Sequence, residues 1–122
     1  MHRAAPTIVV SYRMKLPLDA TIAKEKLTEY LLRKLPENDK SGFLMVAGYN
    51  LDAWERLEAD IRHQLLPLDA EFVETTEYGD KYRIRGSLTG PNGRELHVVS
   101  IWMREEATGL TKYVTLYPAK DA

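Results

Sequence analysis

The chain has 122 residues, of which 44% are hydrophobic and 29% are charged, as is usual for one soluble globular domain. Its formal net charge of −1 argues against a general nucleic-acid binder, although acidic residues elsewhere can offset a local basic surface. The chain has no cysteine, which excludes disulfides and thiolate zinc sites, and no apolar run reaches membrane-spanning length.

The N-terminal residues 1–13 lack the hydrophobic centre of a signal peptide. They form either an extension upstream of a start at Met14 or an extra edge strand through Ile8–Ser11, and the sequence leaves both open. We expect a cytoplasmic protein with no membrane partner, no cofactor and no metal. The histidines have no metal-ligand spacing: His2, His63 and His97.

Three helices are predicted in the first half of the chain. The first ends near residue 35, the second covers about 40–47, and the third covers about 51–65 with apolar residues at helical spacing. The expected caps and terminators are Asp19 or Thr21, Pro36, Asn38 or Asp39, Gly48, Asn50 or Asp52, and Pro67.

After residue 68 the pattern predicts four strands, at 71–78, 81–89, 94–104 and 110–118. Short turns join them in sequence order. We therefore expect an α+β fold in which about three N-terminal helices pack on one face of a four-stranded antiparallel meander sheet, with residues 1–122 as a single domain. The first strand is acidic, which is typical of an edge.

The tripeptide Pro91-Asn92-Gly93 sets the predicted register of the central hairpin. Asn-Gly between alternating residues indicates a two-residue turn, because both turn positions must tolerate a positive φ. With that turn, Arg85 lies opposite Ser100. The face that the helices cover then includes Ile84, His97, Ile101 and Val114.

The opposite, open face of the predicted sheet combines arginines, aromatic rings and hydroxyls. Arginine binds phosphate bidentately and aromatic rings stack on bases, so this face suits a phosphate-bearing ligand. The solvated side of a half-buried sheet has the same residue types, and that is the simpler interpretation. The candidate binding residues are Arg83, Ser100, Trp102, Arg104, Tyr113 and Tyr117.

Lys40 is the most unusual residue of the helical half. It lies in the first turn of the second predicted helix, where the helix dipole disfavours a cation. A solvated lysine balanced by Glu37 and Asp39 is the simpler interpretation. If this helix approaches the end of the sheet, Lys40, Arg85 and Thr115 form a catalytic set for metal-independent RNA cleavage, because cations stabilise the phosphorane and lysine can transfer a proton.

Seven stretches carry a family resemblance, at residues 38–44, 47–49, 54–62, 74–79, 85–93, 100–103 and 113–118. They resemble an uncharacterised family of small stand-alone bacterial proteins, whose related domains look like C-terminal modules of polymorphic toxins. The resemblance covers about residues 14–118. The order of elements is similar to the superfold of barnase, bacterial endoribonuclease toxins and RelE-like toxins. This resemblance implies that RNA lies on the open sheet face, with Lys40, Arg85, Trp102 and Thr115 at the site.

Two functions follow from the sequence. The first is an endoribonuclease-like domain, half of a toxin–antitoxin-type pair, that binds RNA on the open face. The second is a non-catalytic module that uses the same face to bind a small protein from a neighbouring gene, since Trp, Tyr and Arg are typical hot-spot residues. The near-neutral charge favours the second, as does the absence of the histidine that toxin-fused relatives tend to carry shortly before the position of Lys40.

Overall fold

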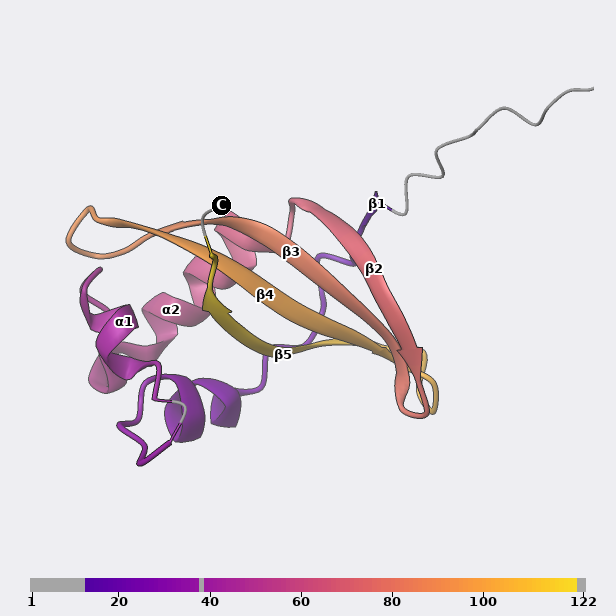
Figure 1. Cartoon of the computed structure of the whole chain (residues 1–122), viewed down its shortest axis with the longest axis horizontal. Helices are drawn as coiled ribbons and strands as arrows, with labels where there is room; N and C mark the ends of the chain where they lie inside the picture. Colours follow the sequence, from indigo (N-terminus) through magenta and orange to yellow (C-terminus); the bar gives the residue numbers. More distant parts are fainter. Residues whose placement is uncertain (1–12, 38, 121–122) are drawn as a thin grey trace, which may run out of the picture.

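The computed structural model describes residues 13–37 and 39–120 of the chain. In this part, five strands form one antiparallel sheet in which each strand pairs with the next along the chain (Figure 1). The α+β class and the meander order are confirmed, whereas the predicted number of four strands was wrong. The strands are β1 Arg13–Lys15, β2 Asp69–Thr76, β3 Gly79–Thr89, β4 Glu95–Glu105 and β5 Thr111–Pro118.

The additional strand is the short N-terminal β1. It pairs with residues 69–71 of β2, so that most of β2 still lies at an edge of the described sheet, as its acidic sequence predicts. The edge strand expected through Ile8–Ser11 lies outside the described residues.

The helical segments lie on one side of the sheet (Figure 1), and the first two are shorter than predicted. The first ends at Leu31 and not near residue 35. The first begins late, because Thr21, an expected cap, bridges to β5 instead. The second ends at Met45, and Gly48 follows with φ of 93°, the left-handed conformation expected there. The third is confirmed as a continuous stretch over 51–65. These segments are η1 Lys26–Leu31, α1 Ser41–Met45, η2 Leu51–Ala53, α2 Trp54–Asp60 and η3 Ile61–Leu65.

The turn between β3 and β4 differs from the predicted one. The Gly90 N–H donates to the Arg94 carbonyl (2.9 Å) and the Gly93 N–H donates to the Gly90 carbonyl (3.0 Å), so the loop is Pro91, Asn92 and Gly93. Such three-residue loops are typically a type I turn followed by a left-handed residue. Pro91 has the fixed φ that the first turn position needs, and Gly93 takes the left-handed position at φ of 86°.

This turn shifts the pairing of β3 with β4 by one residue, so the predicted register was wrong. Tyr82 pairs with Trp102, and Ser87 pairs with His97. Because side chains alternate along a strand, Trp102 and Ser100 lie on the face that the helices cover. His97 lies on the open face.

The covered face forms the core together with the helical layer. Trp102 is fully buried, and its ring meets that of Tyr113 edge-on at 5.3 Å between centroids. The buried Ser100 hydroxyl accepts a hydrogen bond from Trp102 Nε1 (2.9 Å) and donates one to the Ile84 carbonyl (3.2 Å). Its polar group is therefore satisfied within the core.

A bulge interrupts β5 at Val114. Ile101 pairs with Thr115 and Trp102 pairs with Tyr113, which leaves Val114 without a paired residue on β4. The predicted place of Ile101 on the covered face was wrong, because the register shift moves it outward, and the bulge takes Val114 out of the pairing with β4. Bulges often lie beside functional sites, because they redirect neighbouring side chains.

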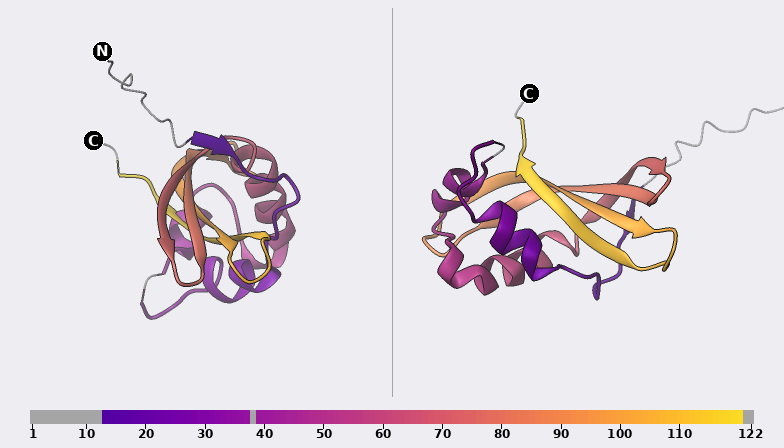
Figure 2. Two further views of the ribbon diagram at one scale, coloured as in Figure 1. Left: turned by 90° about the vertical axis from the view of Figure 1, so that its right-hand side faces the viewer. Right: turned by 90° about the horizontal axis from the view of Figure 1, so that it is seen from below.

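Residues 13–21 connect the two edges of the sheet. β1 pairs with β2 at one edge, and Thr21 bridges β5 at the other. The Thr21 N–H donates to the Thr111 carbonyl (2.9 Å), and the Tyr113 N–H donates to the Thr21 carbonyl (2.7 Å). In the left view of Figure 2 the strongly twisted sheet, this segment and the helices surround the core as a ring.

Candidate functional site

The open face of the sheet keeps two of the predicted arginines. Arg83 Nε lies 3.2 Å from Glu71 Oε1, and Arg85 Nε lies 3.6 Å from the same oxygen. The side chain of Arg85 is 58% exposed. Because one carboxylate serves two guanidinium groups, Arg85 keeps donors available for an anion.

The corrected register brings His97 beside Arg85. Ser87 Oγ lies 3.0 Å from His97 Nδ1, and Glu95 Oε1 lies 3.8 Å from His97 Nε2. Arg85 is the diagonal neighbour of His97 across the β3–β4 ladder, which is within reach of a long side chain. We call Arg85, Ser87, Glu95 and His97 the His97 cluster. Arg85, Ser87 and His97 line a shallow hollow of about 310 Å³.

Two of the three predicted catalytic residues are in contact. Lys40 Nζ donates to Thr115 Oγ1 at 3.1 Å, although the two residues are 75 positions apart. The assumed approach of the second helix to the sheet is therefore correct. Arg85 lies two strands away on β3 and takes no part in this contact.

Lys40 precedes α1 and lies in a cleft. Hydrogen bonds from the Ser41 hydroxyl (2.7 Å) and N–H (3.0 Å) to Asp39 begin this helix and hold the pKa of the Asp39 carboxyl below its usual value. Lys40 itself is partly buried, and this burial lowers the pKa of its ammonium group. The Lys40 cleft has a volume of about 370 Å³. Lys40 and Thr115 line it together with Lys26, Tyr30, Leu35, Glu37 and Val114.

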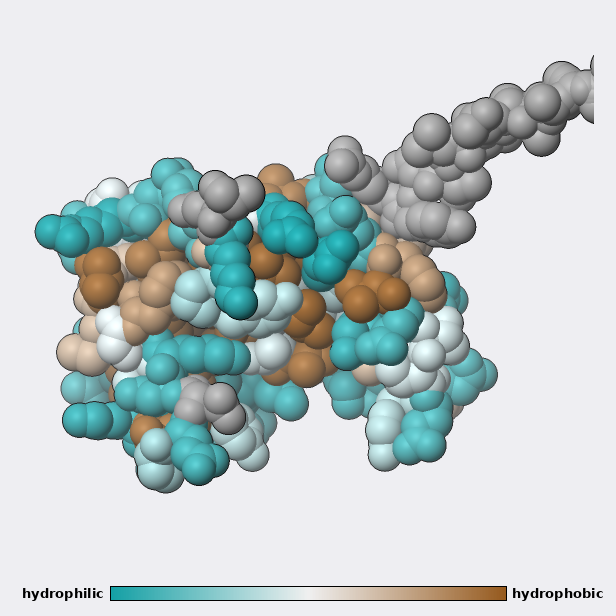
Figure 3. All heavy atoms as spheres, in the orientation of Figure 1, coloured by the Kyte–Doolittle hydropathy of each residue, from teal (hydrophilic) through white to brown (hydrophobic). Residues whose placement is uncertain are grey.

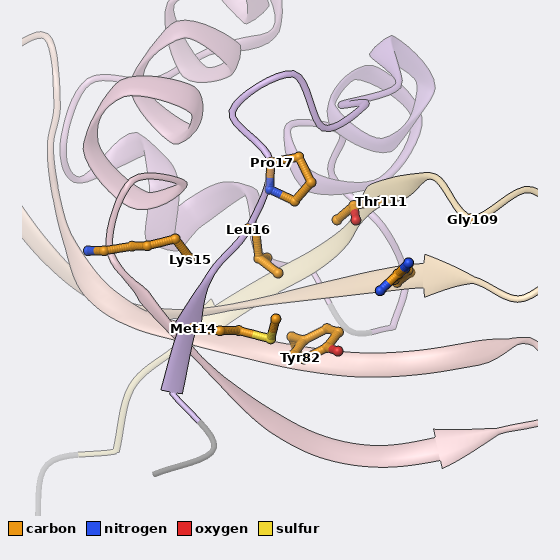
Figure 4. Close-up of a pocket in the computed structure, with 8 residues that line it drawn as sticks. Met14, Lys15, Leu16, Pro17, Tyr82, Gly109 and Thr111 are labelled. Carbon is orange, nitrogen blue, oxygen red and sulfur yellow. The ribbon is translucent and has the colours of Figure 1, made fainter.

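Arg104 lies away from the other arginines. Beyond the helical layer, residues 14–17 cross the covered face and leave a groove of about 410 Å³, which Arg104 and Thr111 help to line (Figure 4). Figure 4 shows Met14 and Tyr82 facing one another in it, and Figure 3 shows the molecule hollowed below the sheet. The predicted place of Arg104 on the open face was wrong, because the register shift turns it to the covered side.

The predicted ring-stacking residues are enclosed in the core. Trp102, Tyr113 and Ser100 are each at most 1% exposed, so their predicted place on the open face was wrong. Burial also raises the pKa of Tyr113 well above its usual value, which keeps the hydroxyl protonated. Tyr117 is 38% exposed and pairs with Val99, on the rung that also carries Arg85.

The prediction from sequence missed the place of His97 on the open face and did not single out Glu95 beside it. It assigned His97 to the covered face through the Asn-Gly turn. The signal that could have corrected this is Pro91 directly before Asn-Gly, because Pro-Asn-Gly also fits a three-residue loop. That loop moves His97 to the face of Ser87 and Arg85.

The family described as a domain of unknown function, DUF6883, matches residues 16–120. The chain belongs to this family. Its match includes β2 to β5 and all the helical segments, and it confirms the resemblance to an uncharacterised domain family. Searches of curated proteins and of solved structures gave no significant match.

Two further findings concern the described residues 13–37 and 39–120. No helix among them is long and apolar enough to cross a membrane. No group of three or more His, Asp or Glu side chains among them is arranged to hold a metal ion.

Proposed function

We propose that this domain is an endoribonuclease-like protein that binds RNA on the open sheet face and cleaves it at the His97 cluster without a metal ion. The observation that carries the proposal is His97, which lies between the Ser87 hydroxyl and the Glu95 carboxylate and diagonal to Arg85. Such cleavage needs a base, a cation for the phosphorane and a proton donor for the leaving oxygen. The His97 cluster supplies one of each.

Each residue has a defined role in the proposed reaction. The 2′-hydroxyl of the RNA attacks the adjacent phosphorus and the bond to the 5′-oxygen breaks, which leaves a 2′,3′-cyclic phosphate and a 5′-hydroxyl. Glu95 accepts the proton of the 2′-hydroxyl, and protonated His97 donates one from Nε2 to the 5′-oxygen. Arg85 binds the non-bridging oxygens, where negative charge increases, and Ser87 accepts from Nδ1 and orients the ring.

The resemblance to toxin modules supports the same proposal. Toxin-fused relatives tend to carry a histidine before the position of Lys40, which this chain lacks. His97 offers a proton-transfer group at another place on the fold. A toxin-type ribonuclease would also need a cognate protein that blocks its open face, in agreement with the predicted small partner.

The test is incubation of labelled transfer and messenger RNA with the purified protein in excess chelator. We expect discrete fragments that end in a 2′,3′-cyclic phosphate. His97→Ala should lower the rate by about 10²–10⁴-fold, and Arg85→Ala should lower it as well. His63→Ala, which changes an exposed histidine on η3, should have no effect. Intact RNA with wild-type protein, or an unchanged rate for His97→Ala, would overturn the proposal.

A specific observation favours the second candidate, a protein-binding module. Most charges of the sheet's open face are paired with one another, as in Arg83–Glu71 and Lys112–Glu105, and the partly exposed Ile101 lies among them. Such a neutral surface with an apolar centre suits a protein partner. Intact RNA together with a stable one-to-one complex with a neighbouring gene's product would favour this function.

A further inference from the structure

We propose that the Lys40 cleft is a separate binding site for a small phosphorylated ligand with a flat body, such as a mononucleotide. It is distinct from the His97 cluster, because Thr115 pairs with Ile101, four residues along β4 from His97. At about 3.3 Å per residue this separates them by about 13 Å. The ligand site does not depend on whether the His97 cluster cleaves RNA.

The charge in the cleft points to an anion. Partial burial removes part of the water around the Lys40 ammonium, and in the described part of the chain its hydrogen-bond partner is the neutral hydroxyl of Thr115. A partly desolvated cation is costly unless an anion pairs with it. Lys26 lines the same cleft and also makes no ion pair with a described residue. Against these two cations the cleft presents one carboxylate, that of Glu37, so its lining side chains carry a net charge of +1, which favours an anionic group.

Thr115 is arranged to take part in binding. Its hydroxyl accepts from Lys40, and its own hydrogen is directed to the Leu116 carbonyl over a long 3.4 Å. Such a weak bond leaves the hydroxyl able to rotate and donate to a phosphate oxygen. The bulge at Val114, directly before Thr115, sets the position of this group at the rim of the cleft.

The remainder of the cleft suits a flat apolar group. Leu35 and Val114 line it, together with the ring of Tyr30, which is 59% exposed. An exposed aromatic ring beside an apolar wall can stack on a base, whatever the identity of that base. The volume of about 370 Å³ lies within the range of roughly 300–1,000 Å³ that small-molecule sites occupy.

The test is isothermal titration of the whole protein with adenosine 5′-monophosphate, adenosine and inorganic phosphate. We expect the monophosphate to bind, and each fragment to bind at least about 10-fold more weakly, because each reaches half of the site. Lys40→Met should weaken binding by about 10-fold or more, through loss of a charge-assisted hydrogen bond. Thr115→Val should weaken it less, and Lys120→Met, which changes an exposed lysine, should not.

Three outcomes would overturn the proposal: no binding of the monophosphate at millimolar concentration, equal affinity for the monophosphate and phosphate, or unchanged affinity in a folded Lys40→Met variant. His97→Ala serves as the control for location. It should retain full affinity for the monophosphate, and a loss there would assign the binding to the open face instead. RNA cleavage is not measured in this experiment, so a failure here leaves the proposed ribonuclease function as it stands.

Discussion

At the residue scale, the partly buried ammonium of Lys40 carries a desolvation cost that a paired anion would offset. The hydrogen-bond partner of this ammonium is a neutral hydroxyl. A methionine of similar length would fill the same space without the desolvation penalty. This penalty supports the proposal that Lys40 pairs with an anionic ligand.

The desolvation penalty of Lys40 should appear as a dependence of stability on pH. Because burial lowers the pKa of Lys40 below the ordinary 10.5, the unfolded chain binds more protons between those two values. The free energy of unfolding should therefore gain a contribution as pH rises through that window. Lys40→Met should remove this contribution and should be at least as stable as wild type at pH 7.

Urea unfolding of wild type, Lys40→Met and Lys120→Met from pH 7 to 10.5 measures this effect. Other lysines and tyrosines titrate in the same range, so the quantity to compare is the difference between variants. The difference between wild type and Lys40→Met should shrink as pH rises, whereas Lys120→Met should run parallel to wild type. A constant difference for Lys40→Met contradicts the account.

At the element scale, the β3–β4 hairpin decides which side chains reach a ligand. Alternation and turn residues were enough to predict these strands and their order, because both depend on neighbouring residues. Alternation and turn residues could not predict the register, because Pro91-Asn92-Gly93 fits two loops that differ by one residue. A distant contact accompanies the observed loop: a Cβ on Gly90 would lie 2.1 Å from the Ala47 carbonyl oxygen. Because Gly90 and Ala47 are far apart in the sequence, no local sequence pattern predicts that contact.

The register shift also decides which candidate residues lie where the sequence placed them. Lys40 and Thr115 were grouped on the assumption that the second helix approaches the end of the sheet, and their contact does not depend on the β3–β4 register. Trp102 and Ser100 were grouped through that register alone, and a shift by one residue moved both into the core. The assumed helix–strand contact was therefore correct, whereas the predicted face of β4 was wrong.

Two glycines at this turn, Gly90 directly before the loop and Gly93 within it, should respond differently to alanine. Gly93→Ala meets no atom within 4 Å but forces a side chain into φ of 86°, which should cost about 1–2 kcal/mol. Gly90→Ala should cost more, because its Cβ collides with the backbone of Ala47 and pushes the hairpin off the helical layer. Gly42→Ala in α1, with open space and a helical backbone, should be neutral or stabilising. Urea midpoints should be lowest for Gly90→Ala, intermediate for Gly93→Ala and highest for Gly42→Ala. A midpoint for Gly93→Ala at or below that of Gly90→Ala would contradict this order.

At the scale of the whole molecule, residues 13–21 hold the ring together. Arg62 of η3 donates from Nη1 to the carbonyls of Leu18 (3.1 Å) and Ala20 (3.0 Å), directly before the bridge between Thr21 and β5. The Arg62 guanidinium therefore links the helical layer to residues 13–21, the segment that connects the two edges of the sheet. Hydrogen bonds to a charged group contribute more than neutral ones.

Arg62→Met should lower the free energy of unfolding by about 2–3 kcal/mol through loss of these bonds. It should also speed hydrogen exchange at the Tyr113 amide, which donates to Thr21. Arg33→Met, which removes an exposed ion pair with Glu29, should change stability by less than about 0.5 kcal/mol. Unchanged exchange at Tyr113 in Arg62→Met would show that another contact holds the segment.

The bridge between Thr21 and Lys112 also orders the events of biosynthesis. A ribosome makes the N-terminal segment early, but its partner strand emerges only after almost all of the described domain has been translated. Contacts this distant in sequence form slowly, because a long loop must close first. The β2–β3 and β3–β4 hairpins, with their local contacts, can assemble during synthesis. The ring should therefore close last, and the nascent chain has an unpaired β4 edge until β5 has been made.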